Sequence, residues 1–287
     1  MVPAIRHGIH LACVIGGNDV SLFPHLIDHY RTLGIESFLF IRHAASVEDP
    51  GYTLIEEAAA KAGITLFHTH VGPWTLDLNQ RLIRYAMDQH PDDWYVLVDS
   101  DEFQVYDRPL PDVIETCERG GYDHVTGCFL DRLGAGGDFP EVGPQPLWDQ
   151  FPLAGSISAG LLRALPLKIG LARGWVELTS GQHGTADGAS LPRASGFIQV
   201  HHVKWTASAL ARLRERAARL DSAAFQQDHS TIVRESRRYL AHVEQHAGRI
   251  NIADPRFRVH PCGSAYTDYP QWREVADEAE GWKWSQI

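Results

Sequence analysis

Residues 94–103 read WYVLVDSDEF, and this stretch decides the fold class because a strand pattern runs directly into a cluster of acidic residues. Trp94 to Val98 are apolar, aromatic or β-branched, which predicts a short buried strand. Asp99, Asp101 and Glu102 follow within four positions. Like charges this close repel one another unless a positive charge lies between them. The stretch therefore predicts a strand end that attracts a cation.

The chain before this stretch alternates between strand and helix patterns. Such alternation is typical of a parallel sheet covered by helices, whose ligands bind beyond the carboxyl ends of the strands. The predicted strands are 9–17, 35–42, 64–70 and 94–101, and the predicted helices between them are 20–34, 52–63 and 76–90. The residues expected at the common rim are Gly16, Gly17, His68, His70, Asp99 and Asp101.

The chain after this stretch continues the pattern less regularly. A helix is predicted at 109–121 and strands at 122–132, 167–174 and 196–205. A long connection rich in glycine and proline separates the first two of these strands, and a loop of this length is usually functional or mobile. From Thr206 onward, two helical patterns with mixed charge predict a C-terminal helical extension.

The composition describes a folded protein that does not bind nucleic acid. Hydrophobic residues make up 44% of the 287 residues and charged residues 22%, which is ordinary globular composition. A formal net charge of -10 argues against a nonspecific phosphate-backbone binder. The 4 cysteines form no metal-binding pair, and reduced thiols are expected.

The N-terminal region has no signal-peptide pattern, and no apolar run approaches the ~18 residues of a membrane span. We therefore predict a cytoplasmic protein and leave peripheral contact with a membrane open. The oligomeric state is not predicted.

Asp99 and Asp101 stand two residues apart at a strand end, so both carboxylates can turn toward one point in space. Oxygen ligands suit a hard divalent ion, and we expect Mn²⁺ or Mg²⁺. The alternative is that Asp99 to Glu102 are solvated loop carboxylates, with Asp99 as a turn residue.

Two segments resemble the GT-A-fold glycosyltransferases, in particular those similar to family two. The first is CVIGGNDVSLFPHLIDHYRTLGIESFLFI (13–41), and the second is NQRLIRYAMDQHPDDWYVLVDSDEF (79–103). In the second, an Asn-containing helix leads into an apolar strand and then a DxD motif. The spacing from Asn79 to Asp99 is longer than in the common family pattern, and a loop insertion HPDD (90–93) accounts for it.

The resemblance implies transfer of a sugar from a nucleotide-diphosphate donor with the help of a divalent ion. By the same resemblance Asp101 would be the firmest metal ligand, Asp99 would contact the metal or the donor, and Asn79 would lie on the donor side. Glu102 would be secondary.

A second group of polar residues ends the strand predicted at 196–205. His202 and Lys204 share one strand face, while His201 lies on the other. The resemblance implies His202 as a further metal ligand and Lys204 as a contact to the donor diphosphate. The alternative is that both histidines are ordinary strand-end residues and Trp205 packs against the next helix.

The donor base and the catalytic base are less defined. Asp19 and Gly17, after the first strand, are candidates for donor recognition, with a plain tight turn as the alternative. The acidic pair that family-two-like enzymes usually carry after the DxD is missing, which leaves the inverting outcome open. The candidates for general base are Asp131, Glu177 and His183.

These expectations combine into a GT-A fold, an α/β architecture with a mixed, mostly parallel sheet flanked by helices. The predicted catalytic domain spans 1–205, with a donor half of about 1–105 and an acceptor half of about 106–205, and 206–287 is the helical extension. The acceptor would be a glycan, a lipid-linked molecule or a small molecule. The alternatives are a sugar-phosphate nucleotidyltransferase and a nucleotide-sugar-binding GT-A domain without catalysis.

Overall fold

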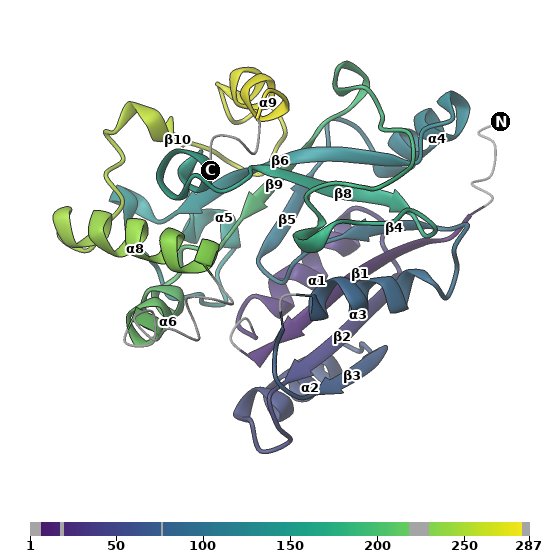
Figure 1. The fold of residues 1–287 in the computed structure, drawn as a ribbon, viewed down its shortest axis with the longest axis horizontal. Coiled ribbons are helices and arrows are strands. Elements are labelled where there is room, and N and C mark those ends of the chain that lie inside the picture. The colour runs from purple at the N-terminus through teal and green to yellow at the C-terminus, as the bar shows by residue number, and fades with distance from the viewer. Residues whose placement is uncertain (1–6, 18–19, 76, 218–229, 283–287) are drawn as a thin grey trace. The chain divides into compact units, whose positions relative to one another are not determined.

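The computed structural model describes residues 7–17, 20–75, 77–217 and 230–282 (Figure 1). Strands β6 and β9 each begin in one compact unit and end in another. The boundary predicted near residue 205 lies close to the point where the chain enters the second unit for the second time. Unit 1 comprises 1–128 and 167–200, and unit 2 comprises 129–166 and 201–287.

The parallel part of the sheet in unit 1 is formed by the first four strands. Strand β1 pairs with β2 on one side and with β4 on the other, and β3 extends the sheet beyond β2. All these pairs are parallel, as the alternation of strand and helix patterns predicts. The strands are β1 (Ile9–Gly16), β2 (Ser37–Ala44), β3 (His68–Val71) and β4 (Trp94–Leu97).

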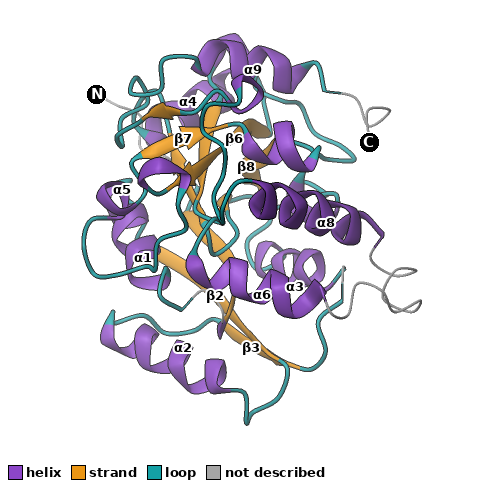
Figure 2. Ribbon diagram, turned by 90° about the vertical axis from the view of Figure 1, so that its left-hand side faces the viewer, coloured by secondary structure: helices purple, strands orange, loops and turns teal. Residues whose placement is uncertain are grey.

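Helices cover both faces of these strands (Figure 2). The ring of Phe23 in α1 meets Phe40 of β2 edge-on at 4.7 Å. The next residue, Ile41, packs in the same apolar cluster as Leu82 and Ile83 of α3. Because neighbouring strand residues point to opposite faces, α1 and α3 lie on opposite sides of the sheet. The helices of unit 1 are α1 (Phe23–Thr32), α2 (Pro50–Lys61), α3 (Leu78–Met87) and α4 (Leu110–Gly120).

The strands that follow β4 change the direction of pairing. Strand β8 is antiparallel to β4 on one side and to the first half of β6 on the other. Strand β5 pairs with β9. The sheet of unit 1 is therefore mixed, since antiparallel pairs of β8 join the parallel pairs of the first four strands. The remaining strands that begin in unit 1 are β5 (Glu102–Val105), β6 (His124–Leu133), β8 (Leu167–Arg173) and β9 (Ile198–His202).

Unit 2 has its own apolar core, in which the last residues of β6 and the helices α6 and α8 pack around aromatic rings. Trp205 stacks on Tyr239 of α8 at 4.8 Å, and both are buried with Leu133 and Phe257. Strand β7 is antiparallel to the second half of β6 and to β10. The other elements of unit 2 are α5 (Leu147–Gln150), β7 (Leu153–Gly155), α6 (Ala207–Ala217), α8 (Ser230–Gln245), β10 (His260–Pro261) and α9 (Trp272–Glu280).

The predicted fold class, a mixed α/β architecture flanked by helices, is confirmed, and the segment after 206 is mainly helical in its described part. The short strands β5, β7 and β10 were not predicted, because two to four residues carry too little periodicity to identify a strand. In the described ranges, no helix combines the length and apolar character of a membrane span.

Candidate active site

The acidic stretch lies at the point of the sheet where the order of the strands reverses. The chain runs from β1 outward to β2 and β3, and then returns to β4 on the opposite side of β1. The carboxyl ends of β1 and β4 are therefore next to each other, with Gly16 at one end and Asp99 just after the other. Ligands of open α/β sheets bind at such a switch point. The predicted rim position of Asp99 follows from this topology.

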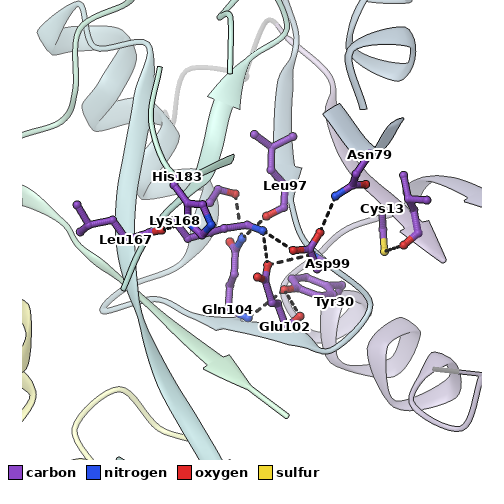
Figure 3. Close-up of polar contacts among 12 residues, drawn as sticks. Cys13, Tyr30, Asn79, Leu97, Asp99, Glu102, Gln104, Leu167, Lys168 and His183 are labelled. Atoms are coloured by element: carbon purple, nitrogen blue, oxygen red, sulfur yellow. Dashed lines mark hydrogen bonds and ion pairs between the residues drawn. The ribbon is translucent and has the colours of Figure 1, made fainter. Parts of the chain in front are cut away.

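A buried lysine lies between two of the three carboxylates (Figure 3). The Nζ atom of Lys168 is 2.9 Å from Oδ2 of Asp99 and 2.9 Å from Oε2 of Glu102. The side chain of Lys168 is fully buried and that of Glu102 is 2% exposed, whereas Asp99 is 38% exposed. The positive charge that the crowded carboxylates require is thus present in the chain itself.

The pKa values follow from this pairing. Burial by itself raises the pKa of Asp99, but the Lys168 ammonium, together with the Asn79 amide, outweighs burial and holds this pKa below its usual value. Burial lowers the pKa of Lys168. Asp99 and Glu102 raise it by more than burial lowers it, so the net shift is upward. Both groups therefore stay charged at neutral pH.

Hydrogen bonds fix the turn that carries these charges (Figure 3). Asn79 Nδ2 donates to Asp99 Oδ1 at 3.0 Å, and Asp99 N–H donates to Glu102 Oε2 at 2.9 Å. Tyr30 Oη donates to the carbonyl of Glu102 at 3.1 Å and accepts from Gln104 N–H at 2.9 Å. Residues 99–104 are thereby tied to α1 and α3. Asn79, predicted on the donor side, reaches this site through Asp99.

The antiparallel register explains how Lys168 arrives there. The last pair between β4 and β8 is Val96 with Leu171. Three further residues on each strand bring Asp99 opposite Lys168. The sequence pattern predicted the strand at 167–174 but not the role of its lysine. The available signal was a single charged residue in the otherwise apolar run LKIGLA (167–172), because a fully buried lysine requires a partner.

The fit of a divalent cation differs among the three carboxylates. Each oxygen of Asp99 accepts a hydrogen bond, from Asn79 or from Lys168, and the ammonium repels a second cation. Asp101 is partly exposed in the same turn, and Mg²⁺ is commonly bound by one or two carboxylates together with substrate phosphates. Within the described ranges, no three His, Cys, Asp or Glu side chains are grouped to hold a metal ion. The geometry disfavours Asp99 as a direct ligand, and the partly exposed Asp101 stays the predicted ligand of the turn.

The turn after β1 contacts α2 closely at Gly17. A Cβ atom at Gly17 would lie 2.4 Å from Cα of Gly51, in the first turn of α2. Glycine is therefore needed there for contact between two segments of the backbone. The predicted donor contact of Gly17 stays a prediction, and Asp19 lies outside the described residues.

Two candidates for the general base lie in the loop after β8. Glu177 is exposed and borders a pocket of about 240 Å³ between α3 and this loop, lined also by Gln80, Arg84 and Leu178. His183 Nδ1 is 2.6 Å from the carbonyl oxygen of Leu167, the residue before Lys168. The loop thus brings His183 next to the strand end that carries the lysine. Both catalytic roles stay predictions.

The third candidate base, Asp131, belongs to unit 2 and is fully buried. Ser158 donates to it through its backbone N–H and its hydroxyl, both at 2.6 Å, and Trp205 Nε1 donates at 3.0 Å. His202 Nδ1 lies 3.3 Å from Asp131 Oδ1. With every side of the carboxylate enclosed, an acceptor hydroxyl cannot reach it. This geometry gives Asp131 a structural role.

His202 and Lys204, predicted to act together at the end of one strand, lie in two different environments within unit 2. His202 is buried between Asp131 and the ring of Phe129, on which it stacks at 4.9 Å. Lys204 is partly exposed, with Nζ 5.9 Å from the centre of the Trp205 ring. The roles of His202 as metal ligand and of Lys204 as phosphate contact stay predictions.

Comparison with known proteins yields only weak structural likenesses. No family model matches the chain, and no curated protein matches it. A putative glucose-1-phosphate thymidylyltransferase from Bacillus anthracis is 8% identical with a TM-score of 0.31, covering 94% of this chain and 95% of its own. S. aureus TarS is 11% identical with a TM-score of 0.36, covering 84% and 74%. A TarS complex with UDP-GlcNAc is 11% identical with a TM-score of 0.37, covering 74% and 66%. Likenesses of this size carry no argument about function.

Proposed function

We propose that this chain transfers a sugar from a nucleotide-diphosphate donor to an acceptor hydroxyl. The observation that carries the proposal is the position of the acidic turn, at the switch point between β1 and β4, where open α/β sheets bind their ligands. A second observation supports it. Asn79 and Asp99, which the resemblance to GT-A glycosyltransferases connects, are joined by a hydrogen bond of 3.0 Å.

A diphosphate leaving group gains negative charge as the sugar departs, and an acidic protein needs a cation to hold it. A bound Mn²⁺ or Mg²⁺ supplies this charge as a Lewis acid. Asp101 would hold the ion from the protein side. Asp99, Glu102 and Lys168 keep the turn that carries Asp101 in place through the ion pairs at 2.9 Å.

The acceptor hydroxyl needs a base that solvent and substrate can reach. Glu177 is exposed and His183 is partly exposed, and both lie in the loop that follows β8. We assign the base to this loop, with a glycan, a lipid-linked molecule or a small molecule as acceptor.

The competing function is that of a sugar-phosphate nucleotidyltransferase. Such enzymes more often carry basic residues in the loop after the first strand. Residues 13–23, CVIGGNDVSLF, contain no lysine or arginine. Donor cleavage therefore ranks above nucleotidyl transfer.

The first prediction concerns Asp101. Replacing Asp101 by Asn should reduce metal-dependent hydrolysis or transfer of the donor by about 100-fold or more, because the charge developing on the diphosphate loses its counter-ion. The measurement is release of free sugar from a panel of nucleotide sugars with and without Mn²⁺. In the same panel, nucleotide diphosphates with Mn²⁺ should raise the Tm of the unaltered protein by mass action.

Asp92→Asn is the matched control, because Asp92 is an exposed aspartate in the loop before β4. It should keep the rate of the unaltered protein. An unchanged rate in Asp101→Asn contradicts the proposal. Pyrophosphate release from a nucleoside triphosphate and a sugar phosphate would establish the competing function.

A further inference from the structure

We propose that Lys168 is a built-in counter-cation that withholds Asp99 and Glu102 from metal binding, so that a divalent ion engages the acidic turn through Asp101. The inference rests on the proposed function for the presence of a metal site, and it names Lys168 as the residue that positions this site. Its basis is the placement of one ammonium group at 2.9 Å from both carboxylates.

The ammonium occupies the place that a metal ion would need. A divalent ion bound by Asp99 and Glu102 together would have to lie close to Oδ2 of the first and Oε2 of the second, and these are the two atoms that Lys168 Nζ contacts. Repulsion between the two cations in a buried setting is strong. A lysine and a metal ion therefore exclude one another at this position.

The burial of Lys168 shows that it acts on its neighbours and not on a substrate. Its side chain has no exposed surface, and it comes from the middle of the sheet, on β8. Glu102 Oε2 also accepts the backbone N–H of Asp99, so the lysine bonds to both ends of the 99–102 turn. Asp101 lies within this turn.

A lysine that only stabilises the fold and one that also controls metal binding differ in one measurable respect. Removing a purely stabilising lysine lowers Tm without increasing affinity for a cation. Removing a lysine that takes the place of a cation leaves Asp99 and Glu102 without a counter-charge. Divalent ions should then bind the turn more tightly, because several carboxylates compete for the same ion.

The test is a titration with Mn²⁺ as the only ligand, followed by electron paramagnetic resonance of the free ion. In Lys168→Met the dissociation constant should fall by about 10-fold or more, because a neighbouring positive charge has been removed. Lys168→Met is expected to be destabilised. Lys168→Met combined with Glu102→Gln is therefore measured in parallel, since it removes one buried charge of each sign.

The double variant should also bind Mn²⁺ about 10-fold or more tightly than the unaltered protein, because Asp99 Oδ2 is no longer paired. Glu102→Gln by itself should stay within about threefold, since Lys168 still covers Asp99. Lys61→Met, at the end of α2, is the control for loss of a lysine. Unchanged Mn²⁺ affinity in the folded double variant overturns the proposal.

The two proposals fail separately. The Mn²⁺ titration contains no nucleotide and no sugar, so its result does not depend on the reaction catalysed. Tighter Mn²⁺ binding without any response to nucleotide diphosphates would support the role of Lys168 and refute the glycosyltransferase function. A response to nucleotide diphosphates without a change in Mn²⁺ affinity would support the glycosyltransferase function and refute the role of Lys168.

Discussion

Asp99 in unit 1 and Asp131 in unit 2 each have several partners, and the two carboxylates are stabilised in different ways. In unit 1, Asp99 faces the ammonium of Lys168 at 2.9 Å and keeps 38% of its side chain exposed. In unit 2, Asp131 is fully buried and accepts hydrogen bonds from Ser158 and the indole of Trp205. The first centre depends on the ammonium of Lys168, and the second on His202 together with the neutral donors of Ser158 and Trp205.

The difference indicates which centre can act on a ligand. A carboxylate enclosed by hydroxyl, amide and indole donors has all its lone pairs directed inward, as Asp131 has. A carboxylate paired with lysine at the edge of a sheet keeps an exposed side. Both have a lowered pKa although burial alone would raise it, Asp99 chiefly through Lys168 and Asp131 through His202 and Ser158.

The largest expected effect on stability is that of Lys168→Met. The change leaves the charge of Glu102 buried and that of Asp99 partly buried without compensation, which should cost about 3–5 kcal/mol of unfolding free energy. The measurement is urea unfolding, with hydrogen exchange to locate the loss. Exchange should accelerate in 94–105 and 167–173, in unit 1.

The double variant Lys168→Met with Glu102→Gln should recover part of this loss, since it removes the buried charge of Glu102, while the partly exposed Asp99 keeps its charge. If the single variant loses no more than about 1 kcal/mol, the lysine does not compensate the carboxylates as the distances indicate.

A smaller effect is expected from Asp131→Asn in unit 2. The amide offers one acceptor oxygen where the carboxylate offers two, so a donor of Ser158 or Trp205 loses its partner. The cost should be about 2–3 kcal/mol. Here hydrogen exchange should accelerate in 129–133 and 153–162, and 94–105 should stay protected. Equal acceleration in both units would contradict the division into separate centres.

The smallest expected effect concerns the pH dependence of stability, to which His29 in unit 1 and Asp131 in unit 2 contribute over different pH ranges. Burial lowers the pKa of His29, on α1, to about 4, and its Nε2 lies 2.8 Å from the carbonyl oxygen of Gln104. Its folded pKa is below its unfolded value, so its contribution is present above pH ~6.5 and is lost as the pH falls toward 4. Asp131, with a lowered carboxyl pKa, loses its contribution only at lower pH.

Between pH 7 and pH 5, His29 should therefore account for about 2 kcal/mol of lost stability. Urea unfolding of His29→Gln at the two pH values should show a correspondingly weaker pH dependence. His7→Gln, near the start of the described chain, is the control and should keep the dependence of the unaltered protein. The same slope in both variants would exclude His29 as the source.

The sequence predicted the parallel half of the fold well, because each of its elements is defined by neighbouring residues. The apolar run before Asp99 and the helical spacing around Leu82 and Ile83 are local patterns, and both elements are present. The position of Asp99 at the rim then follows from the rule for ligand sites in such sheets.

Local sequence patterns did not predict which residues would contact the carboxylates. Asp131, a candidate base, has the same residue type as Asp99 and was likewise predicted near a strand end, but it is fully buried within β6. The burial depends on Ser158 and Trp205, 27 and 74 residues away in sequence. No local pattern connects residues that far apart.

The sequence by itself determined the order of the first four strands and the helices between them, and the crowding of negative charge after the strand of Trp94 to Leu97, since both depend on periodicity and composition over a few residues. Only the tertiary structure decided what neutralises that charge. Strand β8 runs antiparallel to β4, and its register sets Lys168 opposite Asp99, 69 residues earlier in the chain. Strand direction and register follow from packing across the whole sheet, which no short stretch of sequence encodes.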